Sequence, residues 1–166
     1  MGGLKKYDIP GQAYFITTCT FRRKKIFQNE KCCQILLDNL EFYRKKFGFK
    51  LVGYVIMPDH LQCVVLPKTR TTASEIMRDF KKFSAKQISE YLKQNDSSKK
   101  KAKIYNIWQD GFYAFNLDNQ DKLNEKLNYI HSDPVRNGLV SDMEDYKFSS
   151  YLWYTQEKGP IEIDQI

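Results

Sequence analysis

The feature that most constrains the fold is an alternation of strand-like and helix-like segments around a very short turn. Phe49 to Met57 and His60 to Leu66 are rich in β-branched and aromatic residues, and only Pro58-Asp59 separates them. They therefore predict a β-hairpin. Apolar residues at helical spacing precede the hairpin in Asn29 to Phe47 and follow it from Thr71 or Thr72 to about Leu92.

The same alternation continues at both ends of the chain. Ala13 to Phe21 is strand-like, and Ile104 to Trp108 can form a short strand. A further helix is expected from Asp118 or Asn119 to about His131, where Asp133-Pro134 should end it. The order predicts an α+β, ferredoxin-like antiparallel sheet with helices on one face and the other face open for a ligand. We expect residues 1–140 to form one domain and residues 141–166 to be a tail that packs on it.

Charge is unevenly distributed along the chain. The net charge is +7 and 14% of the residues are aromatic. Residues 137–166 carry a net −4, so residues 1–136 carry +11. Cations hold phosphates and flat rings hold unstacked bases, so this composition suggests a nucleic-acid partner. A basic enzyme with a core rich in Tyr and Phe is the alternative, and composition alone does not exclude it. The basic residues cluster at Arg22-Arg23-Lys24-Lys25, Arg44-Lys45-Lys46, Lys81-Lys82 and in a predicted loop from Asn95 to Lys103.

Several classes of protein are disfavoured. The chain has no apolar run long enough for a membrane span, and its first residues lack a secretory signal, so we expect a cytoplasmic protein with no membrane partner. The four cysteines contain no C-x-x-C pair and only two histidines are present, which argues against zinc. We interpret the cysteines as reduced, buried thiols.

A polar pair interrupts the second strand of the hairpin. Alternation places His60 and Gln62 on the same face of that strand, whose other residues are mainly apolar. Buried polar groups are costly unless they are satisfied. Hydrogen bonds would satisfy the pair, and so would a metal ion held by the imidazole nitrogen and the amide oxygen.

Four blocks of the sequence resemble the single-tyrosine transposases of the histidine-hydrophobic-histidine (HUH) type. The hairpin block is similar to their signature Met-Pro-Asn/Asp-His-x-His, and the C-terminal blocks resemble those of the REP-associated branch. The blocks lie in order over most of the chain: Tyr14 to Phe27, Tyr54 to Gln62, Ile107 to Tyr113, and Tyr129 to Val140 with Tyr146 to Tyr151.

The resemblance implies cleavage and rejoining of single-stranded DNA next to a hairpin, through a 5′-phosphotyrosine intermediate. It assigns a Mg²⁺ or Mn²⁺ ion to His60 and Gln62 and the nucleophile to Tyr113. A third ligand is expected about one helical turn after the tyrosine, where Asn116 is our choice over Asp118. The resemblance further implies that phosphates of a DNA hairpin are held by the basic residues Arg22, Arg23, Lys24, Lys25, Lys81, Lys82 and Lys86.

Two departures from the family pattern leave an alternative function open. Gln62 stands where the signature has its second histidine, and Ala114-Phe115 follows the expected tyrosine in place of an acidic residue and a histidine. The alternative is a catalytically weakened relative that binds DNA hairpins. An RNA-binding domain of similar topology is disfavoured because the strands lack an aromatic-rich RNA-recognition consensus. The REP-like tail at Phe148 to Trp153 favours a monomer over a homodimer.

Overall fold

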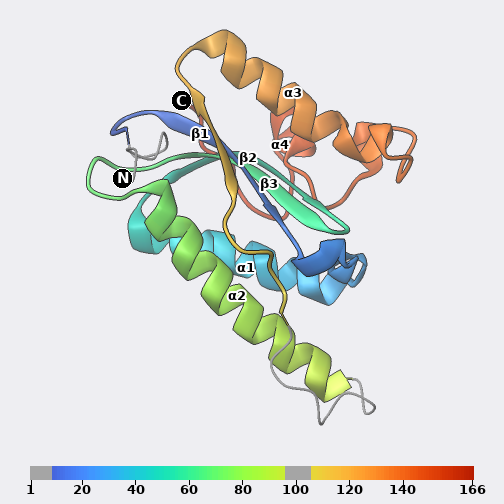
Figure 1. Ribbon diagram of the computed structural model, residues 1–166. Helices are drawn as coiled ribbons and strands as arrows, with labels where there is room; N and C mark the ends of the chain where they lie inside the picture. The colour runs from blue at the N-terminus through green and yellow to red at the C-terminus, as the bar shows by residue number, and fades with distance from the viewer. Residues whose placement is uncertain (1–8, 96–105) are drawn as a thin grey trace.

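The computed structural model describes residues 9–95 and 106–166. Its four-stranded antiparallel sheet has the order β2-β3-β1-β4, which is the ferredoxin-like order. The main elements are β1 (Ala13–Cys19), α1 (Glu30–Phe47), β2 (Lys50–Met57), β3 (His60–Leu66), α2 (Ala73–Asn95), β4 (Tyr113–Leu117), α3 (Gln120–Arg136) and α4 (Tyr151–Gln156), with short 3-10 turns η1 (Phe21–Arg23), η2 (Ile26–Gln28) and η4 (Met143–Asp145). Figure 1 shows this arrangement.

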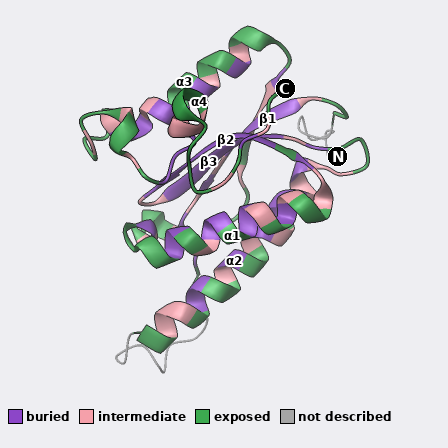
Figure 2. Ribbon diagram, turned by 180° about the vertical axis from the view of Figure 1, so that it is seen from behind, coloured by how far each residue is buried: buried purple, intermediate pink, exposed green. Residues whose placement is uncertain are grey.

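The predicted fold class is confirmed, but the helices do not all lie on one face of the sheet. Helices α1 and α2 cover one face, and α3 lies against the other (Figure 1). Two apolar clusters result, one on each side of the strands, and buried residues therefore line both faces of the sheet (Figure 2). The ligand-binding face expected to be open is thus partly covered by α3.

Strand alternation distributes the side chains as expected. On β3, Leu61 and Cys63 belong to the cluster beneath α1 and α2, whereas Val64 belongs to the cluster beneath α3. His60 and Gln62 have the parity of Val64, so both lie on the α3 side. On β2, a register shift between Leu51 and Gly53 adds a bulge.

Local capping signals begin the first two helices where the periodicity predicts them. The Asn29 side chain accepts hydrogen bonds from the backbone N–H groups of Lys31 and Cys32 at the start of α1. Before α2, Thr72 and Glu75 form a reciprocal capping box, in which each side chain accepts from the other residue's N–H at 3.1 and 2.9 Å.

The predicted end of the third helix is wrong. Helix α3 continues through Pro134 to Arg136, and the N–H of Asn137 still bonds the carbonyl of Asp133. A proline lacks the backbone N–H and so removes one hydrogen bond of the helix. In the last turn this loss does not prevent the remaining residues from staying helical. Asp133 is therefore helical and buried.

The end of the chain runs along β2, which is otherwise an edge strand. The Ile56 N–H donates to the Phe148 carbonyl and the Ser150 N–H to the Tyr54 carbonyl, both at 2.9 Å. Further on, the Asp164 side chain accepts from the Leu51 N–H at 2.8 Å. These bonds occupy the free backbone groups of β2, which protects that edge from pairing with other chains.

Two further expectations meet a different outcome. The strand predicted to end at Trp108 is not present in the described residues, where Trp108 forms only an isolated bridge with Thr20. The fourth strand of the sheet forms later in the chain, at Tyr113–Leu117. The predicted basic loop lies outside the described residues apart from its first residue, Asn95. Within the described ranges, no helix is long and apolar enough to cross a membrane.

Gly53 should be intolerant of a side chain, because α3 packs directly on it. A Cβ at this position would lie 2.6 Å from Cδ2 of Leu127 and 3.3 Å from Cδ1 of Ile130. We expect Gly53→Ala to destabilise the protein by about 1–3 kcal/mol, measured by denaturant unfolding. Gly159→Ala is the matched control, since its nearest atom is the Ile161 carbonyl oxygen at 3.8 Å. Equal stability of the two variants would contradict close packing of α3 on β2.

Candidate functional site

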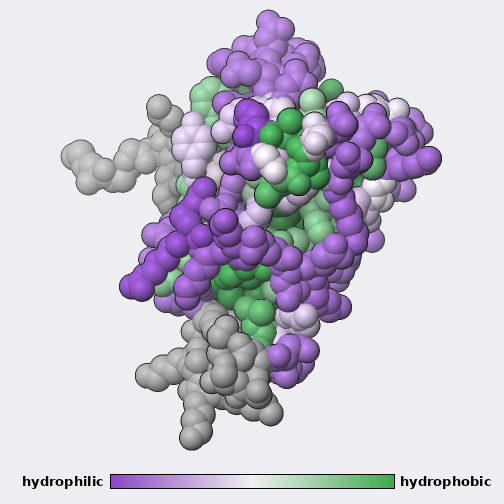
Figure 3. All heavy atoms as spheres, turned by 90° about the vertical axis from the view of Figure 1, so that its right-hand side faces the viewer, coloured by the Kyte–Doolittle hydropathy of each residue, from purple (hydrophilic) through white to green (hydrophobic). Residues whose placement is uncertain are grey.

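A polar cleft of about 710 Å³ opens between the sheet and the C-terminal half of α3. Strands β1, β3 and β4 contribute its floor, and α3 and the η1 turn contribute its walls. Figure 3 views the molecule from the side of the hairpin tip and the end of α3, where hydrophilic residues surround a smaller apolar patch. The lining residues are Phe15, Thr17, Arg23, His60, Gln62, Tyr113, Lys126, Tyr129, Asp133, Arg136 and Asn137.

The imidazole of His60 lies between two carboxylates. Its Nδ1 is 2.7 Å from Oδ1 of Asp59, and its Nε2 is 3.3 Å from Oδ2 of Asp133. A carboxylate on one ring nitrogen is the usual device that orients a histidine whose other nitrogen binds a metal. Asp59 thus orients the ring, and Nε2 points to Asp133 across the cleft.

Asp133 is buried but held in its ionised form. Burial alone would raise the pKa of its carboxyl group, but the hydrogen bond and charge of His60, together with the Arg136 guanidinium, lower the pKa below its ordinary value. Arg136 and Asn137 both donate to Oδ1, at 2.9 and 2.7 Å. The second oxygen, Oδ2, is the one that faces His60.

Gln62 contributes an acceptor that none of the described residues satisfies. Its side chain is 5% exposed, lines the cleft beside His60, and its Oε1 is buried without a hydrogen-bond partner. Such an oxygen is costly unless a ligand completes it. Among the described residues, no group of three or more His, Cys, Asp or Glu could hold a metal ion, so a site here needs the amide oxygen as its third donor.

Two tyrosines line the cleft from opposite sides. Tyr113 begins β4, paired with Thr17 of β1, and is 56% exposed. Tyr129 lies on α3 and is 45% exposed. The ring of Phe15 lies edge-on to both, with centroid distances of 6.4 Å to Tyr113 and 6.2 Å to Tyr129. Because Tyr129 is one helical turn before Asp133, both side chains project from the same side of α3 into the cleft.

The structure brings together three of the four predicted site residues. His60, Gln62 and Tyr113 line one cleft. Asn116 does not join them, because it has the parity of Ala114, which packs against the cluster beneath α1 and α2. The Asn116 Oδ1 is buried without a partner on that opposite face.

The sequence interpretation missed Tyr129 and Asp133. The two residues are four positions apart, which is the spacing of neighbours on one face of a helix, but the helix was predicted to end at about His131, before Asp133. The expected helix break at Asp133-Pro134 obscured this relation, because a residue outside the helix has no fixed relation to Tyr129.

The predicted DNA-binding residues have different environments. Arg23 lines the cleft. Lys81 is occupied: its ammonium donates to the carbonyl of Gln109 at 2.7 Å and to the carbonyl of Gly111, and burial lowers its pKa. The remaining predicted cations are exposed on the surface: Arg22, Lys24, Lys25, Lys82 and Lys86.

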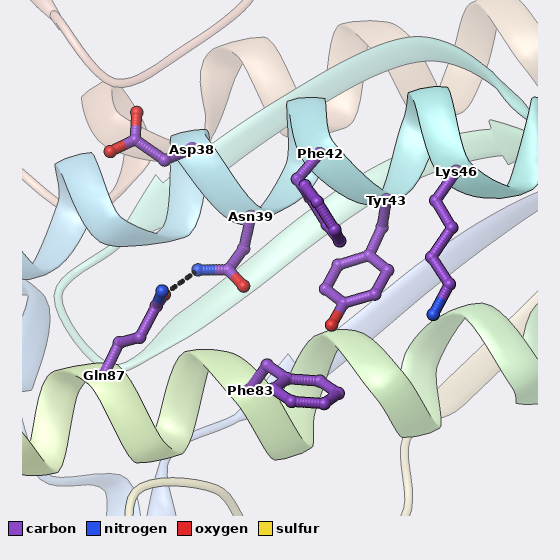
Figure 4. A pocket seen from close by; sticks show the side chains of 7 residues that line it. All are labelled: Asp38, Asn39, Phe42, Tyr43, Lys46, Phe83 and Gln87. Carbon is purple, nitrogen blue, oxygen red and sulfur yellow. Dashed lines mark hydrogen bonds between the residues drawn. The ribbon is translucent and has the colours of Figure 1, made fainter.

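A second cleft, of about 400 Å³, lies between α1 and α2 (Figure 4). Its walls are aromatic, with Tyr43 between the exposed rings of Phe42 and Phe83, and an Asn39–Gln87 hydrogen bond crosses one end. It contains none of the residues of the polar pair and no histidine. The histidine and the polar pair therefore belong to the cleft beside α3.

Comparisons with known proteins agree with this arrangement. The sequence matches the family described as "Transposase IS200 like" over residues 9–133. It is 24% identical to the REP-associated tyrosine transposase of Escherichia coli (strain K12) over 153 residues, covering 91% of this chain and 83% of the relative. A Haemophilus influenzae protein provisionally named as the same type is 26% identical over 159 residues, covering 91% of this chain and 86% of that protein.

One solved structure has the same fold along the whole chain. It is a REP-associated tyrosine transposase bound to a REP hairpin, with a TM-score of 0.73 and 23% sequence identity. The similarity covers 100% of this chain and 93% of that one. It confirms the four-stranded fold.

Lys81 should contribute to stability, in contrast to its neighbour. Lys81→Met leaves the two carbonyls of the loop before β4 without their donor, so we expect the Tm to fall by about 2–4 °C. Lys82 is exposed above the Phe83 ring, at 5.8 Å, and Lys82→Met should change Tm by less than about 1 °C. Thermal denaturation compares the two, and an unchanged Tm in Lys81→Met would contradict the assignment.

Proposed function

Because the chain belongs to the IS200-like transposase family, we propose that it cleaves and rejoins single-stranded DNA next to a hairpin, using a tyrosine of the cleft beside α3. Membership of the family agrees with the resemblance of the four sequence blocks. One observation carries the proposal: the nitrogen of His60, the unsatisfied oxygen of Gln62 and the ionised Asp133 line one cleft together with two accessible tyrosines.

The donor set suits a divalent ion. His60 Nε2, Gln62 Oε1 and Asp133 Oδ2 would hold Mg²⁺ or Mn²⁺, since carboxylate and amide oxygens suit hard cations. The buried, unpaired oxygen of Gln62 and the approach of His60 to Asp133 both fit such a ligand. When bound, the ion supplies polarisation of the scissile phosphate.

Tyr129 is the nucleophile that the geometry favours. Its hydroxyl oxygen bonds to phosphorus as the bond from phosphorus to the 3′ oxygen breaks; the phenol loses its proton and the 3′ oxygen gains one. The Arg136 guanidinium lies 4.2 Å from the Tyr129 ring centroid and the Lys126 ammonium 5.5 Å. These two cations place positive charge where the phosphate must approach. Tyr129 also shares a helix face with Asp133 and lines the same cleft as the donor set, which supports the assignment.

Tyr113 remains the alternative nucleophile, because it lines the same cleft from β4. The test is a hairpin-bearing oligonucleotide incubated with Mn²⁺ and each tyrosine variant. We expect Tyr129→Phe to form no covalent DNA adduct and Tyr113→Phe still to form one, as read on a denaturing gel. The reverse pattern would assign the reaction to Tyr113.

The donor set can be tested without DNA cleavage. We expect His60→Ala and Asp133→Ala to abolish Mn²⁺ binding measured by calorimetry, and Gln62→Leu to weaken it by about 10-fold or more. Asn116→Ala is the matched control, since Asn116 lies on the other face of the sheet. Loss of Mn²⁺ binding in Asn116→Ala, with binding retained in Asp133→Ala, would restore Asn116 as the third ligand.

The second candidate function is binding of DNA hairpins without cleavage. Gln62 supports it, because a glutamine stands where the family signature has its second histidine. Tight hairpin binding by the wild-type protein, with no adduct at any Mn²⁺ concentration, would select this function. In either case the exposed cations, led by Arg22, Lys24 and Lys25, are proposed to hold the phosphates of the hairpin stem.

A further inference from the structure

The turn after β1 has an uncommon backbone conformation. Arg22 and Arg23 are consecutive and both have a φ of 54°. In the described ranges, Glu157 is the only other non-glycine residue with a positive φ. Side chains disfavour this left-handed region, and residues held there cluster at functional sites.

Hydrogen bonds tie this turn to the hairpin turn that carries Asp59. The N–H of Thr20 donates to the Asp59 carbonyl at 2.9 Å, and the Thr20 hydroxyl lies 3.0 Å from the same oxygen. The N–H of Arg23 donates to the Thr20 carbonyl at 3.0 Å. The position of the Arg23 backbone is therefore determined relative to Asp59 and His60.

The Arg23 side chain continues the chain of contacts around His60. Its Nε lies 3.0 Å from Oδ2 of Asp59, and its Nη1 lies 2.6 Å from Sγ of Cys19. The other oxygen of Asp59 holds Nδ1 of His60. Arg23 thus acts on His60 through one shared carboxylate.

Arg23 also differs from its basic neighbours in what it faces. It lines the cleft with a side chain that is 57% exposed, whereas Arg22, Lys24 and Lys25 do not line it. Within the described residues, its Nη2 makes no hydrogen bond or ion pair, so one edge of the guanidinium is free for a ligand in the cleft. Guanidinium groups bind phosphates through such edges.

We propose that Arg23 is a positioning residue that binds a phosphate of the single strand at the cleft and, through Asp59, holds the His60 imidazole in its metal-binding orientation. This inference deepens the proposed function and rests on it. The left-handed backbone at Arg22 and Arg23 allows the Arg23 guanidinium to contact Asp59 and to line the cleft at the same time.

Arg23→Gly separates this role from a structural one. Glycine adopts the left-handed region freely, so the variant should keep a Tm within about 3 °C of wild type. We expect the slope of log Kd against log salt, measured with a hairpin-bearing single strand, to fall by about 0.7. The affinity for Mn²⁺ should fall by about 10-fold, because His60 loses its orienting partner.

Two further variants complete the test. Glu157→Gly relieves the same backbone conformation far from the cleft in sequence, and it should keep the wild-type salt slope and Mn²⁺ affinity. Arg23→Lys keeps the charge but not the planar fork, so it should retain the salt slope and still lose Mn²⁺ affinity. An unchanged salt slope and Mn²⁺ affinity in Arg23→Gly would overturn the proposal. Losses accompanied by a Tm drop of more than about 3 °C would show a structural role and overturn it as well.

Both readouts are binding measurements, so they distinguish this inference from the proposed function. If the wild-type protein forms no covalent adduct, the cleavage reaction fails, while the salt slope and Mn²⁺ affinity still decide the role of Arg23. If the adduct forms and Arg23→Gly matches wild type in both readouts, only the inference fails.

Discussion

The packing of α3 against the second face of the sheet is the contact on which the site depends. His60 and Gln62 belong to β3, whereas Tyr129 and Asp133 belong to α3, so neither element forms the cleft alone. Leu127 and Ile130 are buried in the cluster that joins α3 to the strands. The absence of a Cβ at Gly53 of β2 lets the helix approach this closely. Apolar burial between two elements therefore determines the distance between the polar groups they carry.

Along the cleft, five polar side chains contact one another in a continuous series. Arg23 contacts Asp59, Asp59 contacts His60, His60 faces Asp133, and Asp133 contacts Arg136. Asp59 and Asp133 thus each have an arginine beside them, which lowers the cost of burying their charges. The buried oxygen of Gln62 lies outside this series and has no hydrogen-bond partner among the described residues. A buried acceptor left unpaired in a cleft is suited to a ligand with positive charge.

The sequence predicted the fold more completely than the site. Periodicity and capping located β1, the hairpin, α1 and α2 to within a few residues, because these signals are local. The fourth strand was missed, since Tyr113–Leu117 is short and follows a polar segment. Pro134 was interpreted as a helix end, although a proline in the last turn is compatible with a helix. That single residue concealed the relation between Tyr129 and Asp133.

By itself, the sequence determined that His60 and Gln62 share a face of a strand, because alternation along a strand is a local property. It also determined, through its motif blocks, membership of the transposase family. Only the tertiary structure decided which residues complete the cleft. Asn116 was close to the predicted tyrosine in sequence, but strand parity turns it to the opposite face. Asp133 is 73 residues from His60 in sequence, and the docking of α3 brings its carboxylate to within 3.3 Å of the ring. Long-range packing sets such distances, and no local pattern encodes them.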